Sequence, residues 1–147
     1  MNSSNLHICF ITPEYPNLQK PQGGLGNYIR KVSYDLVNRG HLVSVFVLGK
    51  KQQKRTEHGI DLQYIKRFRF HWRLHSIKRL DPWLKLVEDC VNAKRIKRAV
   101  LFKNQEQKID ILQTPNFKAP GLGLCHNGFF PLVCRCSSYQ PLLRAAN

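Results

Sequence analysis

The strongest constraint on the fold is a pair of apolar runs, residues 7–12 and 42–48, that enclose a glycine-bearing loop and a helical pattern. Continuous apolar runs of this length are typical of strands covered on both faces of a parallel sheet. Between them, apolar residues recur at helical spacing from Leu25 to Leu36, and Gly40 stands where such a helix would end. A strand, a helix and a second strand in this order predict a crossover unit of a parallel sheet.

The rest of the chain continues this alternation. Asp81 is expected to be the N-cap, and Pro82 the first helical residue, of one long helix or two reaching to residue 102. A short helix is expected within residues 119–128, and residues 50–59 form a polar, hairpin-like stretch. Further strands are expected at residues 60–65, 109–113 and 131–136. The predicted fold class is therefore α/β, with a Rossmann-like parallel sheet flanked by helices.

Basic residues are concentrated in the middle of the chain. The 147 residues carry a net charge of +15, and residues 50–108 hold 17 of the 24 lysines and arginines but six of the nine acidic residues. Such an excess implies an anionic partner: nucleic acid, anionic lipid headgroups or a phosphorylated substrate.

Within this segment, apolar and basic residues alternate from residue 67 to residue 75. The alternation fits a half-buried edge strand with a solvated basic face. It also fits contact with an anionic membrane surface. The residues proposed for that contact are Arg67, Arg69, Trp72 and Arg73.

Size and cysteine usage limit the class of protein. The chain is long enough for one domain with a substantial core. Its first residues lack the pattern of a secretion signal, so we expect a cytoplasmic protein, with a peripheral position at the inner membrane face as a further option. The five cysteines follow no regular spacing, and we expect reduced, buried thiols and no metal site.

The loop before the first helix contains three glycines, Gly23, Gly24 and Gly26. Glycines between a strand and a helix make either a tight turn or a place where a ligand approaches the backbone. A helix N-terminus after such a loop offers free N–H groups to an anion. The residues alone leave both interpretations open.

Three motifs in fixed order resemble a known family. The chain reads FITPEYP at residues 10–16, GGLGNY at 23–28 and LVNRGHLVSV at 36–45. This order is similar to the N-terminal domain of glycosyltransferase family 4, whose members are retaining, nucleotide-sugar-dependent enzymes of the GT-B type. The resemblance implies that residues 1–147 are an N-terminal domain, C-terminally incomplete, and that the donor-binding second domain is absent from them.

The resemblance also implies roles for particular residues. The donor-diphosphate loop would comprise Gly23, Gly24, Leu25 and Gly26, with the first two as contact positions. Glu14, Tyr15 and Asn27 would lie on the acceptor side. The enzyme would transfer a hexosyl group from a nucleotide-sugar to a glycan or lipid-linked acceptor, and would need no other cofactor.

The sequence departs from that family in two respects. Ser137 stands where members often carry a histidine, and no two glutamates have the eight-residue spacing of the donor-binding signature. The catalytic residues are therefore unknown, and we expect this chain to be inactive without a second polypeptide that carries the donor domain. The alternatives are a basic module that binds nucleic acid or an anionic surface, without specific nucleic-acid recognition, and a non-functional remnant.

Overall fold

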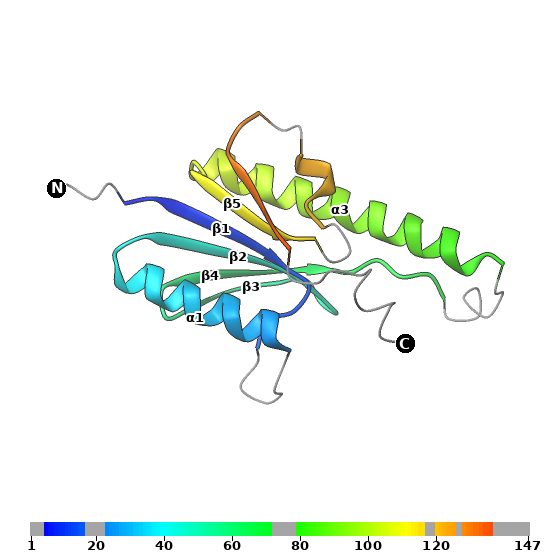
Figure 1. Ribbon diagram of the computed structural model, residues 1–147, viewed down its shortest axis with the longest axis horizontal. Helices are drawn as coiled ribbons and strands as arrows, with labels where there is room; N and C mark the ends of the chain where they lie inside the picture. The colour runs from blue at the N-terminus through cyan, green and yellow to red at the C-terminus, as the bar shows by residue number, and fades with distance from the viewer. Residues whose placement is uncertain (1–4, 17–22, 72–78, 117–119, 126–127, 137–147) are drawn as a thin grey trace.

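The computed structural model describes residues 5–16, 23–71, 79–116, 120–125 and 128–136. Its elements are β1 (His7–Thr12), α1 (Gly24–Asn38), β2 (Leu42–Gly49), β3 (Gln53–Glu57), β4 (Ile60–Lys66), α3 (Asp81–Glu106), β5 (Ile111–Pro115), the 3₁₀ helix η1 (Leu122–Leu124) and β6 (Leu132–Arg135). The six strands form one sheet in the order β3-β4-β2-β1-β5-β6 (Figure 1). All neighbours are parallel except β3 and β4. The predicted Rossmann-like α/β class is confirmed.

The apolar strands are buried on both faces because a helix covers each side of the sheet (Figure 1). On β1, Phe10 belongs to the cluster that packs with Ile29 of α1. Its neighbours Cys9 and Ile11 belong to the opposite cluster, with Ile96 of α3. Successive side chains of a strand point to opposite faces of the sheet. When helices cover both faces, the strand is therefore apolar along its whole length and does not alternate with polar residues.

Helix α1 ends as the sequence predicted. Gly40 has φ +86°, and its N–H donates to the carbonyl of Val37 at 2.9 Å. The N–H of His41 donates to the carbonyl of Leu36 at 3.0 Å, which completes a Schellman motif. The left-handed conformation at residue 40 explains the need for glycine there.

Strand β3 was not predicted as a strand. It forms a hairpin with β4 through His58 and Gly59, which both have positive φ, as in a type I′ turn. All five of its residues, Gln53–Glu57, are polar. An edge strand of this kind carries no burial pattern, which is why the sequence indicated only a hairpin-like stretch.

Most element boundaries differ from their predictions by a few residues, and two of these differences are informative. Helix α3 is a single helix whose N-cap is Leu80, so Asp81 and Pro82 each lie one position further into the helix than expected. Strand β5 begins at Ile111, two residues later than predicted. The N–H of Ile109 instead donates to Asn104 Oδ1 at 2.8 Å, which places residue 109 in the turn after α3.

Candidate functional site: the carboxyl edge of the sheet

The strand order reverses at β1. From β1 the chain proceeds through β2 to β4 on one side, then crosses by way of α3 to β5 and β6 on the other. The segments that follow β1 and β5 therefore diverge at the carboxyl edge of the sheet. In open α/β sheets this switch point is where ligands bind.

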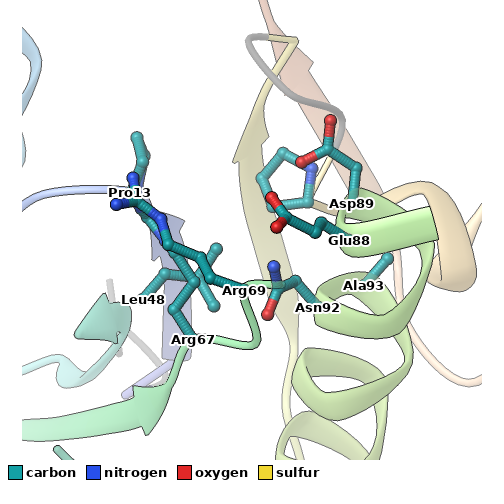
Figure 2. A pocket seen from close by; sticks show the side chains of 9 residues that line it. Pro13, Leu48, Arg67, Arg69, Glu88, Asp89, Asn92 and Ala93 are labelled. Carbon is teal, nitrogen blue, oxygen red and sulfur yellow. The ribbon is translucent and has the colours of Figure 1, made fainter. Parts of the chain in front are cut away.

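Two adjoining pockets lie at this edge. The larger one, of about 490 Å³, is lined by Pro13, Glu14, Tyr15, Val47, Leu48, Gly49, Lys50, Tyr64, Arg67 and Arg69. The smaller one, of about 50 Å³, is drawn in Figure 2. It shares Pro13, Leu48, Arg67 and Arg69 with the first and adds Glu88, Asp89, Asn92 and Ala93 of α3, and Pro120. Strand ends β1, β2 and β4 therefore open into one cleft that α3 borders.

The segment after β4 leaves the sheet and lies against α3. The N–H of Phe68 donates to Asn92 Oδ1 at 2.7 Å, and Asn92 Nδ2 donates back to the carbonyl of Phe68 at 3.1 Å. The N–H of Phe70 donates to Glu88 Oε1 at 2.6 Å. The prediction of an edge strand here is wrong for residues 67–71, because helix side chains replace a neighbouring strand as hydrogen-bond partners. Trp72 and Arg73, and the rest of the alternating pattern, lie outside the described residues.

This arrangement places Arg67 and Arg69 in the cleft. Both line both pockets, and Figure 2 shows them on one side of the smaller pocket with Glu88 and Asp89 on the other. Burial and the neighbouring charge of Arg69 lower the pKa of the Arg67 guanidinium, although Asp89 and Glu88 oppose this shift. Arg67 is half-buried and Arg69 is exposed. The cleft therefore holds two cations close together.

Glu14 is packed into the glycine loop. Its Oε1 accepts a hydrogen bond from the N–H of Gly26 at 3.4 Å. A Cβ atom on Gly23, the N-cap of α1, would stand 2.6 Å from the same oxygen. A Cβ on Gly26 would stand 3.3 Å from Pro16 Cδ. Gly23 and Gly26 therefore make room for the segment after β1, and the carboxylate lies at the positive end of the helix dipole.

Gly24 is different. It is the first residue of α1, it is exposed, and a Cβ added to it would meet nothing within 4 Å. Among the glycines of this loop, only Gly24 is free of an internal packing role. Neither pocket at this edge is lined by Gly23, Gly24, Leu25 or Gly26. The contact of Gly23 and Gly24 with a donor diphosphate stays a prediction. Leu25 is half-buried and packs against the core, as expected.

The three residues expected on the acceptor side are only partly brought together. Glu14 and Tyr15 line the larger pocket, whereas Asn27 is exposed on α1 and lines neither pocket at this edge. Tyr15 is 2% exposed, and its hydroxyl has no hydrogen-bond partner among the described residues. Burial, and next the charge of Glu57, raise the pKa of the Tyr15 phenol, so it is a neutral donor at physiological pH.

Sequence reasoning missed Lys50 and Tyr64, which also line the larger pocket. Lys50 directly follows β2, at the same edge as the glycine loop. The carboxyl end of each predicted parallel strand was the signal that could have identified it. Tyr64 lies within β4, and nothing in the sequence distinguishes it from a core residue.

A second polar cluster lies at the amino end of the sheet. His7 Nε2 is 2.9 Å from Ser44 Oγ and 3.5 Å from Cys9 Sγ, and His7 Nδ1 is 3.0 Å from the carbonyl of Lys108. A cysteine beside a histidine suggests a nucleophile. However, burial raises the pKa of the Cys9 thiol to about 12, so it stays protonated and inert.

The remaining cysteines correct the sequence prediction. Cys9 is buried, but Cys90, Cys125, Cys134 and Cys136 are exposed, so the expectation of buried thiols is right for one residue of five. Within the part of the chain that the structure describes, no three potential ligands gather into a metal site. No helix there is long and apolar enough to cross a bilayer.

The fold and its cleft are those of a Rossmann-like α/β domain, an architecture that many enzyme classes share. The family model of the starch synthase catalytic domain matches residues 7–116, which is most of the chain. The chain therefore belongs to this family. The predicted GT-B class is confirmed, but the match is to the starch synthase family (glycosyltransferase family 5) rather than to family 4. No curated protein matches the chain.

Proposed function

We propose that this chain is the N-terminal, acceptor-side portion of a retaining glycosyltransferase that uses a nucleotide-sugar donor. The observation that carries the proposal is the coincidence of the family match with the cleft. The match covers residues 7–116, and every residue that lines the larger pocket falls within it.

The geometry suggests how the carboxyl edge of the sheet, with the cleft and the adjacent start of α1, would serve transfer. The diphosphate of the donor would approach the N-terminus of α1 at Gly24, where the backbone is exposed and no side chain intervenes. The Glu14 carboxylate, fixed by the N–H of Gly26, would accept a hydrogen bond from an acceptor hydroxyl. Leu25 and Gly26 would hold the start of the helix against the core.

A second domain or polypeptide would supply the rest of the site. Donor and acceptor must be held in one geometry while charge develops on the departing phosphate. We propose that the contacts to the nucleotide and the sugar come from a donor-binding domain outside residues 1–147, and that the chain without it does not transfer sugar. A cytoplasmic location with a peripheral membrane contact fits a lipid-linked acceptor and belongs to the same proposal.

A transfer assay tests this function. Purified protein would be incubated with nucleotide-glucose donors and a glucan acceptor, with and without a separately expressed starch synthase donor domain. We expect no turnover by the chain alone and measurable transfer or donor hydrolysis when the donor domain is added. Efficient transfer by the chain alone would refute the dependence on a second domain. Inactivity in both mixtures, with correctly folded protein, would favour the remnant hypothesis.

One observation favours the alternative function, a module that binds anionic polymers. An open groove of about 900 Å³ lies between α3 and the β3–β4 hairpin. Its lining includes Lys54, Lys66, Arg95, Arg98 and the exposed ring of Phe102. Binding to single-stranded nucleic acid that weakens steeply with salt and is lost in Arg98→Gln would support this function. Binding that is insensitive to that substitution would exclude this groove.

A further inference from the structure

We propose that Arg67 and Arg69 form a binding site for a phosphate group carried by the acceptor. The proposed transfer function does not use this pair: the donor is placed at the glycine loop, and the acceptor hydroxyl at Glu14. The inference rests on the proposed function for its biological use, but binding of a phosphate can be measured without any transfer.

The backbone that carries the two arginines is fixed. Asn92 binds both the N–H and the carbonyl of Phe68, and Glu88 binds the N–H of Phe70. The N–H groups of Phe68 and Phe70 are therefore directed toward α3. Arg67 and Arg69 are the residues that directly precede these two in the chain. Both arginines line the larger pocket as a result. A pair of guanidinium groups held on a fixed backbone suits the planar, two-point recognition of phosphate oxygens.

The charges of the larger pocket favour an anion. Three cationic residues, Arg67, Arg69 and Lys50, line it, against one acidic residue, Glu14. The Glu14 carboxylate is already engaged with the N–H of Gly26. Glu88 and Asp89 line only the smaller pocket, on the α3 side. The lining of the larger pocket therefore carries an excess of positive charge. Burial, followed by the charge of Arg69, lowers the pKa of Arg67, and Asp89 and Glu88 across the smaller pocket oppose that shift.

Tyr15 also lines this pocket, but it is 2% exposed and packs in the core on the α1 side of the sheet. Its hydroxyl is buried, so the contacts offered to a phosphate come from the arginines and Lys50.

The spacing of the strands separates the arginines from the glycine loop, which is why we place the phosphate on the acceptor. The arginines follow β4 and the glycine loop follows β1, with β2 between them. Neighbouring strands lie about 4.8 Å apart, so these two parts of the edge are separated by about 10 Å. That interval accommodates a sugar ring. The ring's phosphate would lie at the arginines, and its reacting hydroxyl would point toward Glu14 and the donor.

Calorimetry on the full chain tests the site. We would titrate inorganic phosphate, glucose 6-phosphate and glucose into the parent protein, the double variant Arg67→Gln/Arg69→Gln and a control, Lys31→Gln/Arg39→Gln. The control removes the same charge from exposed residues outside both pockets. We expect glucose 6-phosphate to bind at least about tenfold more tightly than glucose to the parent and control, and this advantage to vanish in the pocket variant. Equal affinities in all three proteins would overturn the proposal.

Two further experiments complete the test. The variant Arg67→Lys/Arg69→Lys keeps the charge but loses the two-point geometry, so its affinity for glucose 6-phosphate should be intermediate. If the glutamine variant does not fold, parental affinity in the lysine variant overturns the proposal. Flotation with vesicles of phosphatidylglycerol, compared with vesicles of phosphatidylcholine, distinguishes a lipid phosphate from a soluble one. Binding to the anionic vesicles that depends on the two arginines assigns the phosphate to a lipid.

Transfer assays with a donor domain present separate this site from the proposed function. Unchanged transfer to a phosphorylated acceptor by the glutamine variant would refute the site but keep the proposed function. Phosphate binding that depends on the two arginines, without any transfer, would support the site and refute the proposed function.

Discussion

At the scale of single residues, Glu14 explains most of the glycine loop. Its carboxylate occupies the space that a side chain at Gly23 would need, and it accepts the N–H of Gly26. The sequence showed three glycines but could not show this contact, because residues 14 and 26 are 12 positions apart in the chain. The two internal packing roles and the one exposed position, Gly24, become distinguishable only in three dimensions.

The three-dimensional arrangement predicts a clear cost for one of two neighbouring substitutions and almost none for the other. Gly23→Ala should lower the free energy of unfolding by about 1 kcal/mol, because the new Cβ displaces Glu14 and alanine is a poor N-cap. Gly24→Ala should change it by less than about 0.5 kcal/mol, because the position is open and helical. Urea unfolding of both variants measures this. In a Glu14→Ala background the cost of Gly23→Ala should shrink, and an unchanged cost would contradict the packing role.

Gly24 is also the position at which binding can be separated from folding. Since Gly24→Val leaves the core untouched, any loss of sugar transfer in the assembled enzyme would arise at the ligand. Transfer at the parental rate in that variant would return the loop to the interpretation of a plain turn.

A second residue-scale prediction concerns the ion pair between Lys103 of α3 and Asp61 of β4, whose Nζ and Oδ2 lie 2.9 Å apart. Burial alone would raise the pKa of Asp61, but hydrogen bonds from Lys103 and Gln63, with the charges of Lys103 and Lys54, lower it below its ordinary value. The ionised carboxylate therefore stabilises the fold above about pH 4, and this contribution is lost as the pH falls through the folded-state pKa.

Lys103→Met should thus destabilise the protein by about 3 kcal/mol at pH 7, because it leaves Asp61 without its main partner. The difference from the parent should shrink as the pH falls from 6 to 3. Lys85→Met serves as a control, since the pair of Lys85 with Asp81 on the same helix is largely exposed and should contribute less than about 0.5 kcal/mol. A difference for Lys103→Met that does not vary with pH would argue against this account.

At the scale of elements, strands β1 and β2 were predictable and the segment after β4 was not. The apolar runs at residues 7–12 and 42–48 need two covered faces, which few arrangements other than a parallel sheet provide. Residues 67–71 also carry a strand pattern, but their backbone hydrogen bonds go to Asn92 and Glu88 of α3. The periodicity of a sequence indicates which side chains lie on the same face of a segment. It does not indicate which groups accept or donate the hydrogen bonds of its backbone.

Asn92 is therefore predicted to position the arginine pair. Asn92→Ala removes both hydrogen bonds to Phe68 at a site that is 6% exposed, and should cost about 1–3 kcal/mol of stability. It should also weaken the binding of glucose 6-phosphate although the charge of the pocket is unchanged. Asn38→Ala, at the exposed end of α1, is the matched control and should change neither quantity. Loss of stability with parental phosphate affinity would limit Asn92 to a structural role.

At the scale of the whole molecule, the sequence predicted the fold class and the broad enzyme class but chose a neighbouring family. The motifs at residues 10–16, 23–28 and 36–45 encode a strand, a loop, a helix start and a helix end, all of which serve the shared architecture of GT-B domains. Motifs of this kind report the fold more reliably than the substrate. The cleft at the carboxyl edge is the feature that links this architecture to a function, and its lining comes from five separate parts of the chain.

The central claim is that substrates bind at this edge, and amide chemical-shift mapping tests it most directly. Labelled protein would be titrated with a nucleotide-glucose donor and with glucose 6-phosphate. The account predicts perturbations for the donor at Gly24, Leu25 and Gly26, and for the sugar phosphate at Gly49, Lys50 and residues 67–69, with little change at the amino edge around Gly40 and Asp110. Perturbations confined to the groove between α3 and the β3–β4 hairpin, or to the amino edge, would contradict it.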